Sequence, residues 1–149
     1  MDAKKGDGAE ARLEYYKEQL AHGRHTEVQR SSVAALAAAF CGAIIGKLLD
    51  PPLDRTKLSY SVALFLVGLV SLVITAKLYE RFRLHNEVAR LVRDDIDENL
   101  GKFRREAEKN IKQRYPFLFR VQLHIVWNVL LGLFAAIGLV ASILILKGQ

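Results

Sequence analysis

Residues 77–120, KLYERFRLHNEVARLVRDDIDENLGKFRREAEKNIKQRYPFLFR, decide how the rest of the chain is organised. This segment holds 12 of the 22 Lys and Arg residues and 8 of the 16 acidic residues, so it belongs in water. Long apolar runs precede and follow it, which ties both of its ends to one face of a membrane. A straight helix of this length would reach about 65 Å. We therefore expect the segment to fold back or to lie along the membrane surface, with a hinge at residues 98–101, where Asn and Gly favour a helix end.

The apolar runs are long enough to cross a bilayer, since about 20 apolar residues span its hydrocarbon core. They are residues 31–49, 58–76 and 121–146. The last two carry no Asp, Glu, Lys or Arg, and the first carries only Lys47, near its end. Residues 50–57, DPPLDRTK, form a short turn whose two prolines stop the first helix. The sequence therefore predicts an all-α integral membrane protein with three transmembrane helices, an antiparallel hairpin plus a third span.

The segments outside the membrane are predicted to be mainly helical. We expect a disordered tail at residues 1–9 and a cytoplasmic amphipathic helix at 10–30, because Leu13, Tyr16 and Leu20 recur at helical spacing. The charged segment shows the same spacing on both sides of its hinge, so it is expected to form amphipathic cytoplasmic helices. The polar start of the chain does not suit a secretory signal peptide, and we expect the first span to be retained as an anchor.

The distribution of basic residues predicts the orientation. Six Lys and Arg residues precede the first span and 12 lie in the charged segment, whereas the turn region has three, Lys47, Arg55 and Lys57. Basic segments next to spans stay in the cytoplasm. We therefore expect a cytoplasmic amino terminus and an external carboxyl terminus at residues 147–149.

Small residues form a stripe on the first span. Its members are Ala35, Ala39, Gly42 and Gly46. Helices in lipid gain nothing from the hydrophobic effect, so they associate where small residues let their backbones approach closely. Two interpretations follow. The stripe packs against the chain's own second span, which the short turn favours, or it forms the seam of a homodimer.

The third span carries a stripe of polar and small residues at intervals of four. They are Arg120, His124, Asn128 and Gly132. Polar groups at membrane depth usually face protein or water rather than lipid. The stripe either forms hydrogen bonds with the hairpin, which is the commoner arrangement, or lines a water path in an oligomer.

Three histidines are candidates for a metal or proton site. His22 precedes the first span by about the same helical distance, roughly 13 Å, as His85 follows the second, and His25 is three residues from His22. Antiparallel helices would bring these side chains together. No metal-binding spacing fixes such a site. The ordinary interpretation is that they are surface residues, and we expect no bound metal.

Enzyme signatures are missing from the sequence. It has no Gly-rich phosphate loop, nucleophile elbow or HExxH motif. The single cysteine, Cys41, excludes a disulfide within one chain and a Cys-based zinc site. We therefore expect neither catalysis nor a cofactor. The basic excess of the cytoplasmic segments suits anionic lipids, and the acids among the basic residues argue against nucleic acid. The expected partners are membrane lipids, further copies of the chain and a protein at the cytoplasmic helices.

Three features resemble the SLATT-like group of small bacterial membrane effectors. They are the helical stretch EYYKEQLAHGRHTEVQRSS at residues 14–32, the hairpin around the Asp50-Pro51-Pro52 turn and the charged helix that leaves the second span. The resemblance is architectural and covers about the first hundred residues. It implies a membrane hairpin joined to cytoplasmic helices that assembles into a pore in bacterial antiviral defence.

A transporter or membrane enzyme is the least expected function, because three spans are few and no ionisable residue lies at mid-membrane. Two other functions are expected. The first is a self-assembling, pore-forming or membrane-disrupting effector of a defence or stress system. The alternative is a non-catalytic scaffold or regulatory subunit of a larger membrane complex.

Overall fold

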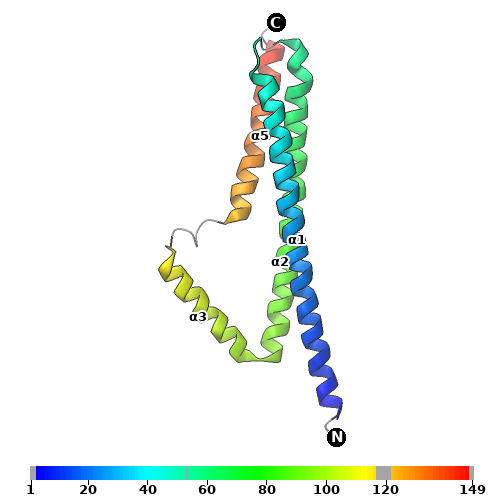
Figure 1. Ribbon diagram of the computed structural model, residues 1–149, viewed down its shortest axis with the longest axis vertical. Coiled ribbons are helices and arrows are strands. Elements are labelled where there is room, and N and C mark those ends of the chain that lie inside the picture. The colour runs from blue at the N-terminus through cyan, green and yellow to red at the C-terminus, as the bar shows by residue number, and fades with distance from the viewer. Residues whose placement is uncertain (1–2, 53, 117–121, 148–149) are drawn as a thin grey trace. The chain divides into compact units, whose positions relative to one another are not determined.

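A computed structural model describes residues 3–52, 54–116 and 122–147. All elements within these ranges are helical (Figure 1). They are α1 (Ala3–Leu49), the 3-10 helix η1 (Arg55–Lys57), α2 (Leu58–Ile96), α3 (Glu98–Arg114) and α5 (Leu123–Lys147). The predicted all-α class is confirmed for this part of the chain.

Three of these helices are long and apolar enough to cross a membrane. The candidate spans lie within Glu10–Leu49, Arg55–Ile96 and Leu123–Lys147. The first two contain the apolar runs 31–49 and 58–76, and the third contains residues 123–146 of the run 121–146. Length and hydropathy together thus support a membrane protein.

The first helix begins earlier than predicted. α1 starts at Ala3, so the disordered tail expected at residues 1–9 is wrong from residue 3 onward, and the first two residues lie outside the described ranges. The early part is rich in Ala, Lys and Glu, which are strong helix formers. Each further residue adds one hydrogen bond to an existing helix, and this propagation outweighs the cost of two glycines.

A short capped turn separates α1 from α2. α1 ends at Leu49, immediately before Asp50-Pro51-Pro52. The Asp54 side chain then caps η1, because its Oδ1 accepts a hydrogen bond from the Thr56 backbone N–H at 3.0 Å. η1 leads directly into α2.

The break in the charged segment lies before the predicted hinge. α2 ends at Ile96, and Asp97 has extended backbone angles and accepts a hydrogen bond from the Asn99 N–H at 2.8 Å. Residues 98–101, the predicted hinge, are instead the first turn of α3. A carboxylate at the N-cap accepts hydrogen bonds from free backbone N–H groups, and its negative charge interacts favourably with the positive end of the helix dipole. Here that cap decides the boundary, rather than the weak helix propensity of Asn and Gly.

The chain divides into two compact units, and each unit contains part of α1 and part of α2. The polar unit comprises Met1–Val28 and Tyr79–Gln122. The apolar unit comprises Gln29–Leu78 and Leu123–Gln149.

In the apolar unit, parts of α1, α2 and α5 pack around a small core (Figure 1). Cys41 and Ile44 of α1 meet Leu64 of α2 there, and Phe134 of α5 packs against them. α5 also contacts η1, which places the turn beside the third helix. Large apolar side chains such as that of Leu36 are exposed on the outside of the unit, as expected for a surface that faces lipid.

In the polar unit, the first part of α1 meets the last part of α2 through polar side chains. Arg12 Nη1 lies 2.6 Å from Asp95 Oδ2, and Gln19 Oε1 lies 2.8 Å from His85 Nδ1. Several apolar side chains of this unit are more than 60% exposed. They are Val28, Leu84, Leu91 and Phe103. The unit therefore presents apolar as well as charged groups on its surface.

Candidate functional site

Close backbone contacts in the apolar unit join α2 and α5. A Cβ on Gly68 would lie 2.6 Å from the backbone nitrogen of Ala135, and a Cβ on Gly138 would lie 2.7 Å from the Ser61 carbonyl oxygen. Cβ atoms do not approach backbone atoms so closely, so glycine is required at both positions. The two backbones meet directly, the arrangement that small residues allow between membrane helices.

Hydroxyl groups add polar contacts along the same seam. Ser142 Oγ lies 2.9 Å from Ser61 Oγ and 2.8 Å from the Gly138 carbonyl oxygen. Thr75 Oγ1 lies 2.8 Å from the Ser71 carbonyl oxygen and 3.4 Å from Asn128 Oδ1. The contact with Asn128 is long and therefore weak. It still shows that this amide faces α2 within one chain.

The described members of the predicted polar stripe of the third span differ in their contacts with α2. Asn128 lies against Thr75, as the packing interpretation expects, and His124 is half-buried. At Gly132, an added Cβ would meet no described heavy atom within 4 Å. Arg120 lies outside the described residues. Packing against α2 therefore accounts for Asn128 but not for Gly132.

The small stripe of α1 does not pack against α2, so the favoured interpretation of it is wrong. Ala35 and Ala39 are exposed, and among the described atoms nothing lies within 4 Å of a Cβ added at Gly42 or Gly46. A neighbouring face is buried instead. It carries Ala34, Ala37, Cys41 and Ile44. Its larger side chains fill the space beside Leu64, and buried area with close contacts decides which face of an apolar helix packs.

Two of the three candidate histidines meet in the polar unit. The rings of His22 and His85 are stacked, with centroids 5.4 Å apart and planes 26° apart. His22 Nε2 lies 3.5 Å from Glu18 Oε1 in the same helix, while His25 is exposed. No group of three His, Cys, Asp or Glu residues in the described part of the chain has a geometry that could hold a metal ion. Two of the three rings thus meet as helical rise predicts, and within the described residues His25 does not complete a metal site.

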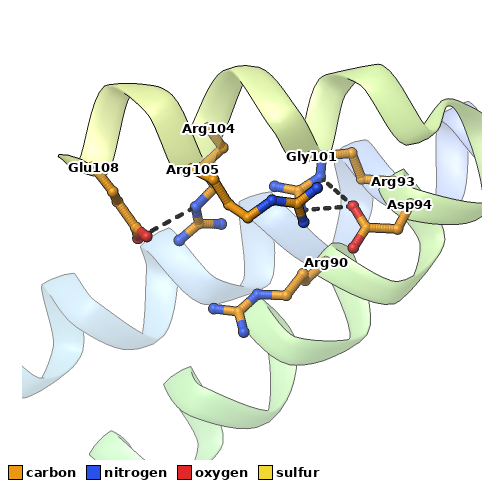
Figure 2. Close-up of a pocket in the computed structure, with 7 residues that line it drawn as sticks. All are labelled: Arg90, Arg93, Asp94, Gly101, Arg104, Arg105 and Glu108. Atoms are coloured by element: carbon orange, nitrogen blue, oxygen red, sulfur yellow. Dashed lines mark hydrogen bonds and ion pairs between the residues drawn. The ribbon is translucent and has the colours of Figure 1, made fainter. Parts of the chain in front are cut away.

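A cavity of about 160 Å³ lies between α2 and α3, within the polar unit (Figure 2). The residues that line it are Arg90, Arg93, Asp94, Gly101, Arg104, Arg105 and Glu108. Sequence reasoning treated this segment as a charged surface and missed the cluster. A signal was present, because arginines at spacings of three and one flank a helix break.

Sequence reasoning also missed Gly138, the glycine of closest approach. The available signal was the pair Gly138 and Ser142, two small residues four positions apart on one face of an apolar helix. The same pattern at Gly42 and Gly46 drew attention to a face that is open in the structure. Comparison with models of protein families, with curated proteins and with solved structures gives no match to this chain.

Proposed function

We propose that this chain is a multi-pass protein of the bacterial inner membrane that self-assembles and, as an assembly, permeabilises the membrane as an effector of a defence or stress system. In this proposal α1 and α2 form a membrane hairpin, and α5 is the third span. The Lys and Arg distribution supports a cytoplasmic polar unit and an external carboxyl terminus. The architectural resemblance to SLATT-like effectors points the same way.

The open face of α1 carries the proposal of self-assembly. In lipid, a stripe with Ala35, Ala39, Gly42 and Gly46 permits close approach of another helix, and within the described chain the positions of the two glycines have no neighbour. The two glycines that do pack, Gly68 and Gly138, illustrate how close such an approach becomes. A second copy of α1 would use the same geometry across a symmetric interface.

Exposed apolar side chains of the polar unit give independent support. Leu84 and Leu91 of α2 and Phe103 of α3 lie in segments too charged to enter a bilayer. Burying an apolar side chain of this size is worth about 1.5–3 kcal/mol. A second copy of the chain therefore gains free energy by covering these residues, which strengthens an assembly that begins in the membrane.

One observation favours the alternative, a non-catalytic scaffold or regulatory subunit. A water path needs polar groups that face it, yet Asn128 and Ser142 are turned toward α2 within one chain. An effector of this kind would either line its path with other groups or break the seam between α2 and α5. A scaffold needs neither.

Overproduction in bacteria tests both functions. Uptake of a membrane-impermeant dye and loss of membrane potential are expected for the wild type, with oligomers captured by a crosslinker. The double variant Gly42→Leu, Gly46→Leu is expected to lose oligomers and permeabilisation together, because leucines keep the α1 backbones apart. Gly132→Leu is the matched control for oligomer formation, since it also adds a side chain at an open glycine.

Distinct outcomes contradict distinct parts of the proposal. Oligomers that survive in the α1 double variant but disappear in Gly132→Leu would move the seam to α5. A membrane that stays tight and polarised around crosslinkable oligomers would favour the scaffold. A chain that stays monomeric in the membrane at every expression level would refute self-assembly.

A further inference from the structure

The cavity between α2 and α3 has an excess of positive charge. Its lining contains four arginines but only two carboxylates, so its formal charge is +2. Figure 2 shows arginine side chains from both helices gathered around it. Four guanidinium groups that share one small cavity repel one another unless anions compensate them. The two carboxylates of the lining supply half of that compensation.

Both carboxylates are already engaged. Asp94 Oδ1 accepts hydrogen bonds from Arg93 Nε at 2.9 Å and Nη2 at 2.7 Å. Glu108 lies 3.7 Å from Arg104 Nε. The Arg93 side chain is only 10% exposed, so its positive charge is buried between α2 and α3. Each acid is thus paired with one arginine, and the other two arginines have no ion pair with an acid of the lining.

Arg90 and Arg105 carry the remaining charge. Arg90 forms a long ion pair, at 3.4 Å, with Glu87, which does not line the cavity. Arg105 forms no ion pair or hydrogen bond with any residue in the described ranges. These two side chains come from different helices, so one ligand between them would contact both α2 and α3.

The end of α2 and the first turn of α3, which frame the cavity, lie in close contact. A Cβ on Gly101 would lie 2.9 Å from Asp94 Oδ1, so glycine allows the first turn of α3 to approach the Arg93–Asp94 pair. Asp97 caps the same turn of α3. The position of the arginines therefore depends on this bend and not on one helix alone.

We propose that this cavity, the arginine cavity, binds a phosphoryl dianion, either a free phosphate or phosphomonoester or the phosphomonoester headgroup of a lipid. The guanidinium fork matches the oxygens of a phosphate group and binds it with charge-assisted hydrogen bonds. A phosphomonoester carries about −1.5 to −2 charges at pH 7, close to the excess of the lining. A volume of about 160 Å³ is several times the space that one water molecule needs, so the cavity has room for a phosphate group.

This site goes beyond the proposed assembly and does not require it, because all of its residues belong to one chain. A bound dianion bridges α2 and α3 and holds the bend at Asp97. Binding of the ligand would therefore stabilise one angle between α2 and α3 within the polar unit.

The test uses the purified full chain in phosphatidylcholine nanodiscs, titrated calorimetrically with inorganic phosphate at constant ionic strength. Saturable binding is expected for the wild type. Arg105→Gln should weaken it about tenfold or more, since a hydrogen bond to a charged group is worth about 1.5–3 kcal/mol. Arg83→Gln is the matched control. It removes the same charge from an exposed position of α2 outside the lining, so binding should stay within about twofold of the wild type.

Arg105→Lys keeps the charge, is expected to fold in any case and should bind more weakly than the wild type because the fork is lost. The proposal is overturned if wild-type protein shows no saturation at millimolar phosphate. It is equally overturned if Arg105→Gln or Arg105→Lys binds as the wild type does, or if Arg83→Gln weakens binding as much as Arg105→Gln.

A second set of nanodiscs, containing phosphatidic acid, identifies the source of the dianion. If the lipid headgroup is the ligand, wild-type protein should no longer bind added phosphate, and Arg105→Gln should release phosphatidic acid from the purified protein. If the ligand is soluble, phosphate should bind equally well in both lipid compositions. Both outcomes support the arginine cavity as a phosphoryl site and separate its two sources.

Discussion

The apolar and polar units join their helices in different ways. In the apolar unit, α2 and α5 meet backbone to backbone at Gly68 and Gly138. In the polar unit, α1 and α2 are linked by long side chains, and the Arg12 and Asp95 side chains are 57% and 63% exposed. Lipid offers no hydrophobic gain, so close contact must hold helices there. In water, exposed ion pairs contribute little. Substitutions in the apolar seam should therefore have the larger effects.

Gly138→Leu should give the largest effect. The new side chain would collide with the backbone of α2 near Ser61, and overpacking of this kind costs about 3 kcal/mol at its upper range. Unfolding in detergent, followed by helicity and by elution from a sizing column, measures the loss. Gly132→Leu on the same helix is the control and should be nearly neutral in the monomer. Equal losses in both variants would remove close packing as the explanation.

Hydroxyl and amide contacts across the same seam should give smaller effects. A double-mutant cycle with Ser61→Ala and Ser142→Ala should yield a coupling free energy of about 1 kcal/mol, within the range for hydrogen bonds between membrane helices. A second cycle with Thr75→Val and Asn128→Ala should give less, because its contact is 3.4 Å rather than 2.9 Å. The reverse order would show that the two contacts differ from those in the structure.

The Arg12–Asp95 pair should contribute less again. A double-mutant cycle with Arg12→Ala and Asp95→Ala should give about 0.5 kcal/mol or less, because both side chains are largely exposed. Raising the salt concentration should reduce the coupling further. A coupling that exceeds that of the serine pair, or one that salt leaves unchanged, would contradict the contrast between the two units.

The turn before α2 should show the smallest effect, because its polar contacts lie in water although it belongs to the apolar unit. The hydrogen bond from the Thr56 side chain lowers the pKa of Asp54 below its usual value. A lowered pKa means that the folded turn favours the carboxylate, so its stabilisation is complete above the usual pKa and is lost as pH falls through the lowered value.

Acid titration followed by NMR of Asp54 measures this pKa, and Asp54→Asn should remove the pH dependence of the turn while keeping a hydrogen-bond acceptor. A carboxyl group that titrates at or above its usual pKa would show that the cap is not formed.

Most of the helical architecture was predictable because it depends on local pattern. The prolines after Asp50 end α1 in every arrangement of the helices, and long apolar runs in the sequence identify the spans. The two errors in boundaries are also local. Helix propagation extends α1 back to Ala3, and the Asp97 cap moves the break ahead of residues 98–101. The meeting of His22 and His85 followed from helical rise together with the expected antiparallel arrangement of the two helices.

The contacts between helices were less predictable. A helix that is apolar on all sides has no hydrophobic periodicity to mark its buried face. Gly42 and Gly138 both belong to small-residue pairs four apart, yet only the second meets a neighbouring backbone in the described structure. The same limit applies to Asn128, for which packing and a water path were both open before its contact with Thr75 was known.

The sequence by itself determined the helices, the candidate membrane spans and the charged segment between the second and third of them, since hydropathy, proline and caps act over a few residues. Only the tertiary structure decided that α2 and α5 form the glycine seam and that arginines on both sides of Asp97 line one cavity. Those outcomes depend on the rotation of each helix about its axis and on the bend between α2 and α3. Both are set by close packing between residues far apart in the chain, which no local pattern records.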